Sequence, residues 1–178
     1  MKNRFIILLA VISIAACLLS YATAQQNKNA VTVELKNGQG ESVGTATLTA
    51  MNKRGGVRIK LNVKNLTPGQ HGIHFHQMAK CEGPNFESAG AHFNPDSKMH
   101  GLKNPKGPHA GDMLNFVVNK DGTSKVTLSD VRVNLGTDAR SLYSNGGTSL
   151  VIHEKADDLK TDPSGNSGAR IGCGVISH

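Results

Sequence analysis

Three histidines and a cysteine lie within the short stretch HGIHFHQMAKC, residues 71–81. His74 and His76 are two positions apart, so in a β-strand their side chains would share one face, about 7 Å apart. Two imidazoles on one face can reach one metal ion, and His153, which ends the run 149–153, could join them from another strand. The alternative is that His74 and His76 are polar side chains on a surface hairpin. The pair alone does not decide between this alternative and a metal site.

A second group of candidate ligands lies in one glycine- and proline-rich segment. It follows the pattern His92-x7-His100-x8-His109-x2-Asp112. A segment with few apolar residues cannot hold its shape by burial. A metal ion bound by three histidines and one carboxylate would supply that order, as structural zinc does in closed four-coordinate sites. A polar loop with scattered histidines is the alternative, and the spacing favours neither.

The elements that must position these side chains are predicted to be strands. Residues 31–35 and 57–63 alternate apolar and polar side chains, which is typical of antiparallel strands with one face in a core. Tight turns are expected at residues 52–56 and at Asp121-Gly122. Further strands are expected at residues 44–51, 72–76, 115–119, 125–128, 149–153 and 172–176. No segment shows a sustained helical period, so the predicted fold class is all-β, an antiparallel sandwich or flattened barrel.

Two segments are too long to be simple turns between these strands. They are residues 81–111 and 154–170, and both carry charged residues and glycines, the first also the histidines of the second group. Long loops on a rigid β scaffold usually carry function or are mobile. We see no internal repeat and no linker that would indicate a second domain.

The start of the chain has the features of a secretory signal peptide. A basic beginning is followed by the apolar residues 5–19 and a small-x-small site, which predicts cleavage after Ala24 and a mature domain of residues 25–178. A transmembrane anchor is the alternative, although the apolar run is short for a span. A lipid-bearing Cys17 is another, because Ile14-Ala-Ala-Cys17 looks like a bacterial lipobox. We expect export to the periplasm or the extracellular space, with membrane attachment only if Cys17 is lipidated.

Charge and cysteine content narrow the function further. The formal net charge is +7, and loss of Lys2 and Arg4 with the leader lowers it to +5. Nucleic acid is not an expected partner, because no binding motif or platform of aromatic residues accompanies this charge. Export would leave Cys81 and Cys173, which predict one disulfide closing about ninety residues, for which chain entropy gives about 4–5 kcal/mol. Reactive thiols or a cysteine metal site are the alternatives.

Taken in order, a series of motifs resembles the copper-zinc superoxide dismutase family, and the resemblance extends over essentially the whole mature chain. The motifs are His74-Phe-His76, Gly90-Ala-His92-Phe-Asn-Pro95, His100-Gly101, His109-Ala-Gly-Asp112, Leu150-Val-Ile-His153-Glu-Lys-Ala-Asp157-Asp158 and Gly165-Asn-Ser-Gly-Ala-Arg170-Ile-Gly-Cys173-Gly-Val. The resemblance implies a Greek-key β-sandwich and an enzyme that converts superoxide into oxygen and hydrogen peroxide, protecting against extracytoplasmic oxidative stress. A copper- and zinc-binding or buffering protein with little turnover is the alternative.

The resemblance also implies a role for each candidate residue. It implies one copper ion bound by His74, His76, His92 and His153, and one zinc ion bound by His92, His100, His109 and Asp112. His92 would bridge both metals and carry a proton, and Arg170 would supply a fixed positive charge for the small anion superoxide. Asp157 would link His74 to His100, and Cys81 would pair with Cys173. The resemblance leaves a homodimer open.

Overall fold

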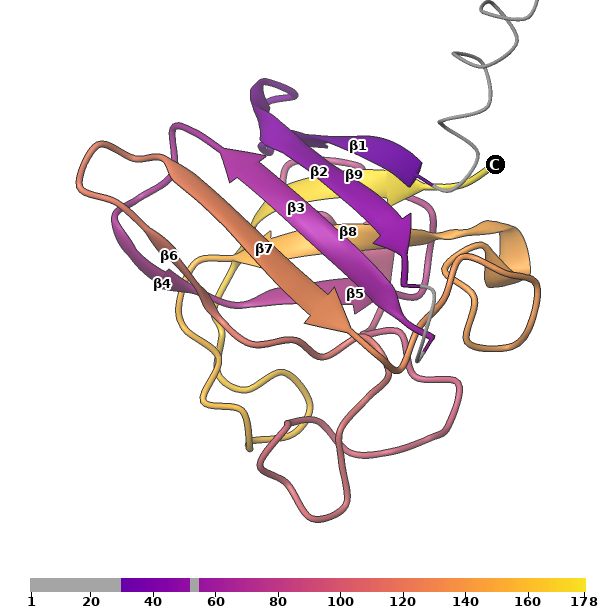
Figure 1. Ribbon diagram of the computed structural model, residues 1–178. Coiled ribbons are helices and arrows are strands. Elements are labelled where there is room, and N and C mark those ends of the chain that lie inside the picture. Colours follow the sequence, from indigo (N-terminus) through magenta and orange to yellow (C-terminus); the bar gives the residue numbers. More distant parts are fainter. Residues whose placement is uncertain (1–29, 52–54) are drawn as a thin grey trace, which may run out of the picture. The chain divides into compact units, whose positions relative to one another are not determined.

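Nine strands form the regular structure of the residues that the computed structural model describes, which are 30–51 and 55–178 (Figure 1). The strands are β1 Ala30–Lys36, β2 Ser42–Ala50, β3 Val57–Val63, β4 Gly69–His71, β5 Ile73–His76, β6 Phe116–Val118, β7 Ser124–Asp130, β8 Thr148–His153 and β9 Arg170–Ile176, with short 3-10 helices η2 Glu87–Ala89 and η3 Ser144–Gly146. No helix in the described part is long and apolar enough to cross a membrane.

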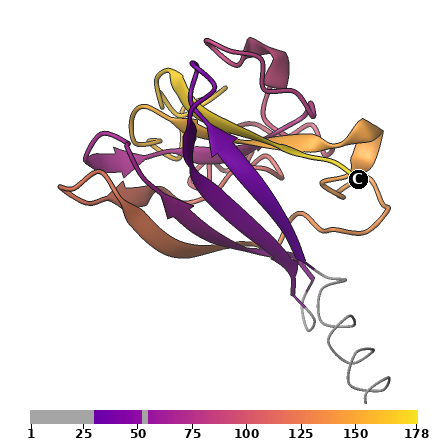
Figure 2. The ribbon, with the colours of Figure 1, turned by 90° about the horizontal axis from the view of Figure 1, so that it is seen from above.

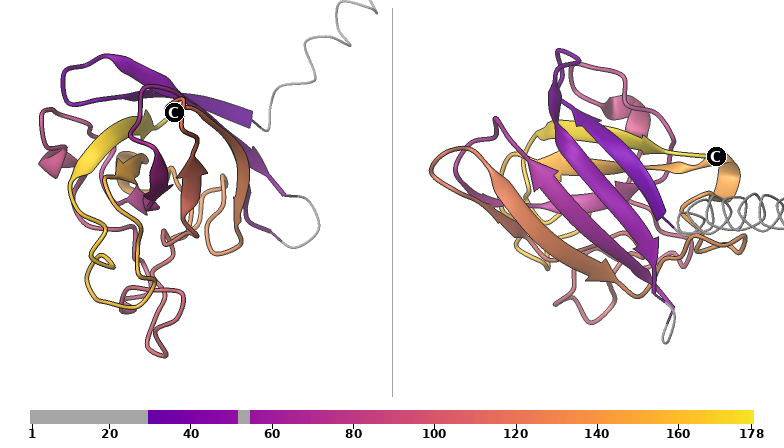
Figure 3. Two further views of the ribbon diagram at one scale, coloured as in Figure 1. Left: turned by 90° about the vertical axis from the view of Figure 1, so that its left-hand side faces the viewer. Right: turned by 45° about the horizontal axis from the view of Figure 1, so that its top comes forward.

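The strands form one long sheet and one short one. The long sheet has the order β5-β8-β9-β1-β2-β3-β7, and β4 pairs with β6 in the short sheet. The pairs β2–β3, β3–β7, β5–β8, β8–β9, β1–β9 and β4–β6 are all antiparallel. Figures 1 to 3 show the long sheet curling over, with β2, β3 and β7 in one layer and β5, β8 and β9 in the other. The predicted all-β, antiparallel fold is therefore confirmed.

Alternation along the strands places one face of each layer in a common core. In β3 every second residue is buried, whereas Arg58 and Lys60 between them are exposed. Phe75 and Leu150 are fully buried in the same cluster from the opposite layer. Because neighbours in a strand point to opposite faces, burial of Phe75 turns His74 and His76 to the outside of the sheet.

Each predicted strand is present, and one further short strand was not predicted. The strand predicted at residues 72–76 is β5, and β4 is a separate strand before it that pairs with β6. Strand β4 was missed because three residues are too few to show an alternation. The turn at Asp121-Gly122 is present. The predicted turn at 52–56 lies partly outside the described residues, and the predicted leader and Cys17 lie wholly outside them.

Two long loops lie together below the strands in the view of Figure 1. The β5–β6 loop comprises residues 77–115 and the β8–β9 loop residues 154–169. They contact directly, since the backbone N–H of Lys103 donates to the carbonyl of Leu159 at 2.8 Å. The two loops predicted at 81–111 and 154–170 therefore contact each other and lie together beside the outer face of β5 and β8.

Candidate metal centre

The candidate ligands are anchored to β5 by backbone pairing. His76 and His92 form an isolated antiparallel bridge, as do His74 and Asp112. Phe93, the neighbour of His92, is buried in the core and donates its N–H to the carbonyl of Phe75 at 2.8 Å. Strand β5 therefore acts as a template that holds two distant parts of the β5–β6 loop beside its own histidines.

The backbone of Gly111 lies so close to β5 that only glycine fits at this position. An added Cβ there would lie 2.5 Å from the carbonyl oxygen of Phe75, closer than any side chain tolerates. Gly111 also pairs in two directions, donating its N–H to the carbonyl of Phe93 and accepting from the N–H of Phe75. The glycine between His109 and Asp112 thus brings Asp112 to the histidine cluster.

Four buried imidazole nitrogens converge in a first donor cluster. They are His74 Nδ1, His76 Nε2, His92 Nε2 and His153 Nε2, and none of them has a hydrogen-bond partner. The ligand atoms of these four residues lie within 4.8 Å of one another. Buried polar atoms are almost always hydrogen-bonded, so four unpaired nitrogens facing each other have the arrangement of a cation-binding site. Imidazole donors suit copper, so this cluster fits a copper ion.

A second donor cluster surrounds one carboxylate oxygen. Asp112 Oδ1 is 3.0 Å from His92 Nδ1, 3.0 Å from His100 Nδ1 and 3.2 Å from His109 Nδ1. A tetrahedron with zinc–ligand bonds of about 2.0–2.1 Å has edges of roughly 3.3 Å, close to these separations. The other oxygen, Oδ2, accepts from the N–H groups of Gly101 and His109 and so fixes the carboxylate. Three nitrogens and one oxygen in this arrangement fit zinc.

His92 belongs to both clusters. Its Nε2 is one of the four unpaired nitrogens, and its Nδ1 faces Asp112. The ring of His92 lies between the two groups, with centroid distances of 4.1 Å to His74 and 5.4 Å to His109. One imidazole can therefore offer a nitrogen to each of two cations.

Asp157 connects the clusters on their outer side. Its Oδ2 lies 2.7 Å from His74 Nε2 and 3.0 Å from His100 Nε2. The Asp157 main chain is held in turn by the side-chain amide of Asn115, which both donates to its carbonyl and accepts from its N–H. A carboxylate on the outer nitrogen fixes the tautomer of a metal-binding histidine and its orientation.

Burial keeps the first cluster neutral. It lowers the pKa of His74 and His76, and it lowers the pKa of His92 to about 4 and that of His153 to about 3. These imidazoles are therefore unprotonated at neutral pH. Neutral imidazole is the form that binds a metal ion.

In the second cluster, the charged forms of His100 and Asp112 are favoured instead. Burial would lower the pKa of His100, but hydrogen bonds with Asp112 and Asp157 outweigh burial and raise it to about 9. Burial would raise the pKa of Asp112, but hydrogen bonds from His100, His109 and His92 hold it far below its usual range. The ionised Asp112 is therefore stabilised by positive charge beside it. Either a proton on His100 or a bound cation can supply that charge.

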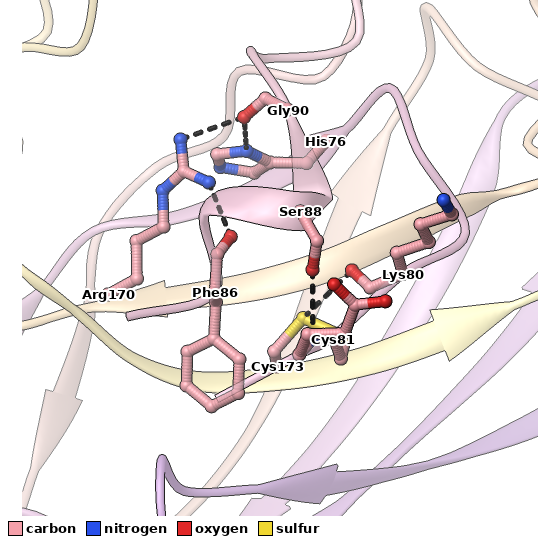
Figure 4. The surroundings of a disulfide bond; sticks show 9 residues. His76, Lys80, Cys81, Phe86, Ser88, Gly90, Arg170 and Cys173 are labelled. Atoms are coloured by element: carbon pink, nitrogen blue, oxygen red, sulfur yellow. Dashed lines mark hydrogen bonds between the residues drawn. A yellow bond between two sulfur atoms is a disulfide. The ribbon is translucent and has the colours of Figure 1, made fainter. Parts of the chain in front are cut away.

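A disulfide and an arginine border the first cluster (Figure 4). Cys81 and Cys173 are bonded across 92 sequence positions, which ties the β5–β6 loop to β9. Arg170 donates from Nη1 to the carbonyl of Phe86 at 2.6 Å and from Nη2 to the carbonyl of Gly90 at 2.7 Å. The Gly90 carbonyl lies 3.0 Å from His76 Nδ1 as well, so one carbonyl orients both the arginine and a candidate ligand.

The structure thus brings together every site residue named from the sequence, although their roles stay predictions. His71, read as structural, is buried outside both clusters, with Nδ1 2.7 Å from the carbonyl of His153. Sequence reasoning missed Asp162, whose Oδ1 accepts from the N–H of His100 at 2.5 Å. It also missed the Gly90 carbonyl, because the pattern of side chains contains no signal for a backbone hydrogen-bond acceptor.

Comparison with known proteins agrees with this geometry. The family model for copper/zinc superoxide dismutase (SODC) matches residues 42–176. Superoxide dismutase [Cu-Zn] 1 of Aquifex aeolicus is 44% identical over 92% of this chain and 96% of its own. The crystal structure of a SOD-like protein from Bacillus subtilis has a TM-score of 0.79 at 39% identity, covering 82% of this chain and 97% of the other. The Cu/Zn superoxide dismutase from Brucella abortus has a TM-score of 0.68 at 29% identity, covering 83% and 99%. The chain belongs to the copper/zinc superoxide dismutase family.

Proposed function

We propose that this chain dismutates superoxide at a copper ion joined through His92 to a structural zinc ion. Copper would be held by His74, His76, His92 and His153, and zinc by His92, His100, His109 and Asp112. One observation carries the proposal: the two ring nitrogens of His92 lie in two different donor clusters, and both clusters are buried. A single histidine between two cations would couple the redox site to the loop that the zinc orders.

The chemistry needs a centre that accepts one electron from a superoxide and returns it to a second. Copper supplies that one-electron exchange, and zinc, which has no redox chemistry, orders its ligands. The net reaction consumes two superoxide anions and two protons and yields oxygen and hydrogen peroxide. In this chain His92 Nε2 would hold and deliver a proton when it is not bound to copper, since its Nδ1 stays engaged beside Asp112.

Arg170 would attract the substrate. It faces His153 across the β8–β9 pairing, and its guanidinium is fixed by two carbonyl oxygens. Burial lowers its pKa from the usual value, yet an arginine stays charged at any physiological pH. A fixed positive charge close to His76 and His153 would raise the encounter rate of a small anion, and salt would screen it.

Superoxide consumption measured together with metal content tests the proposal. We expect about one copper and one zinc per chain after reconstitution, with rapid superoxide loss. Arg170→Ala should lower kcat/KM about tenfold and flatten its dependence on ionic strength, at unchanged metal content. Full loading with both metals but no turnover would favour the metal-buffering alternative, and a steering role for Arg170 is excluded if the salt dependence is unchanged.

We further propose that the protein is exported and that residues 25–178 are its mature domain. The Cys81–Cys173 disulfide supports this, because disulfides persist in oxidising compartments. There the enzyme would protect extracytoplasmic components from superoxide. The mass of the mature N-terminus distinguishes cleavage after Ala24 from a lipid on Cys17, and a chain that keeps Met1 in the cytoplasm would contradict export.

A further inference from the structure

His100 is held at each of its polar atoms, and from both loops. Its Nδ1 faces Asp112 and its carbonyl accepts from the side chain of Asn104, both in the β5–β6 loop. Its Nε2 faces Asp157 and its backbone N–H donates to Asp162, both in the β8–β9 loop. The zinc candidate His100 is therefore clamped between two loops, and Asp162 makes the shortest of these contacts, at 2.5 Å.

Asp162 also faces a second zinc candidate. The Oδ1 atom that accepts from His100 lies 4.0 Å from His109 Nε2, the outer nitrogen of a ring whose Nδ1 faces Asp112. Among the described residues, the outer nitrogens of the other candidate rings already have partners: His74 and His100 share Asp157, and His76 faces the Gly90 carbonyl. A carboxylate is the usual partner of the outer N–H of a metal-binding histidine.

We infer that Asp162 is a second positioning carboxylate of the zinc site, beside Asp157. It fixes the main chain at His100 by a hydrogen bond and places negative charge opposite the outer nitrogen of His109. Negative charge there raises the basicity of the imidazole toward a cation on its other nitrogen. The inference rests on the proposed zinc site and adds that zinc retention depends on a residue of the β8–β9 loop that contributes no ligand.

A purely local role in loop folding is the competing explanation, and Asp158 provides the matched control. Asp158 lies in the same loop, is exposed and accepts from the N–H groups of Lys160 and Thr161. Its other oxygen accepts from Asn166. Removing either carboxylate changes the charge of the loop equally and cuts backbone hydrogen bonds, but only Asp162 contacts zinc candidates.

The test is the zinc dissociation constant, measured by competition with a chelator for the whole protein, Asp162→Ala, Asp162→Asn and Asp158→Ala. Asp162→Ala should bind zinc tenfold to a hundredfold more weakly, the range seen when such outer partners are lost. The zinc affinity of Asp162→Asn should lie between those of Asp162→Ala and the unchanged chain, because an amide oxygen still accepts from His100 but carries no charge. Asp158→Ala should stay within about twofold of the unchanged chain. If Asp162→Ala does not fold, Asp162→Asn against Asp158→Ala decides.

A second readout separates positioning from loop folding. In zinc-loaded, copper-free protein, the proton on His109 Nε2 should give an NMR signal at lower field in the unchanged chain than in Asp162→Asn, with no shift in Asp158→Ala. Equal zinc affinities for all variants, or an unmoved His109 signal, would overturn the inference. Failure of the unchanged chain to bind zinc would instead contradict the proposed function, so the two outcomes are distinguishable.

Discussion

The chemistry of this centre depends on single nitrogen and oxygen atoms of a few side chains. His92 has one nitrogen in each donor cluster, so it has no spare atom for any other partner. Asp112 and His153, by contrast, each belong to one cluster only. Substitutions at these two positions should therefore separate the functions of the two metals.

Asp112→Ala should lose zinc and thermal stability while copper binding persists. His153→Ala should do the reverse, abolishing superoxide turnover with zinc largely kept. The reason is that each substitution removes a donor from one cluster and leaves the four donors of the other in place. Elemental analysis, thermal unfolding and superoxide consumption measure the three effects, and loss of both metals from both folded variants would contradict independent sites.

Asp157 should act on both metals at once, because its carboxylate contacts His74 in one cluster and His100 in the other. Asp157→Asn is expected to weaken copper and zinc binding by about tenfold or more each. Chelator competition for each metal measures this, with Asp158→Asn, the exposed neighbouring acid, as the control. A change confined to one metal would show that Asp157 does not link the sites.

The alternation of apolar and polar side chains along the strands could be predicted from the sequence, whereas the contacts between the two loops could not. Burial on one face dictates the period of two in β3. In Ile73–His76 all four residues are buried, but the alternation of apolar residues and histidines correctly placed His74 and His76 together. The contact between Asp162 and the N–H of His100 joins residues 62 positions apart in two irregular loops. No periodicity or spacing encodes such a contact, so Asp162 could not be found before the structure.

The end of β7 offers a pH-dependent element beside the zinc candidate Asp112, whose carbonyl accepts from the Arg132 guanidinium. Burial raises the pKa of Asp130 to about 6, although the neighbouring Arg132 guanidinium, 3.0 Å away, acts in the opposite direction. The folded state therefore holds this proton more tightly than the unfolded chain does. The stability that this group contributes is fully present below about pH 4 and is lost as the pH rises through about 6.

Comparing Asp130→Asn with the unchanged chain isolates this contribution, because metal release and other titrations are common to both. The stability of the Asn variant relative to the unchanged chain should rise between pH 4 and pH 6 and then level off. Chemical denaturation at a series of pH values measures the difference. A difference that stays flat over this window would show that Asp130 keeps an ordinary pKa.

For the molecule as a whole, the two layers of the sheet supply a rigid support and the two loops a site that depends on metal. Residues 94–108 and 154–169 contribute no buried hydrophobic side chain, so polar contacts and bound cations must order them. The sheet has a continuous apolar core, so we expect it to keep its structure without metal.

Removal of both metals by chelation should therefore loosen the loops selectively. Amide hydrogen exchange in residues 94–108 and 154–169 should accelerate by at least tenfold, while β2, β3 and β7 keep their protection. The melting temperature should fall, because a ligand bound only by the folded state stabilises it. Uniform acceleration over the whole chain would instead mean that the metals support the sheet itself.

The position of each metal relative to His92 shows whether this residue joins a copper site to a zinc site. Anomalous X-ray diffraction from crystals of the reconstituted protein, recorded on both sides of the copper and zinc absorption edges, locates the two elements separately. We predict copper about 2 Å from His92 Nε2 and zinc about 2 Å from His92 Nδ1. A single mixed site, or a His92 ring that contacts one metal or neither, would contradict a bimetallic centre joined by this residue.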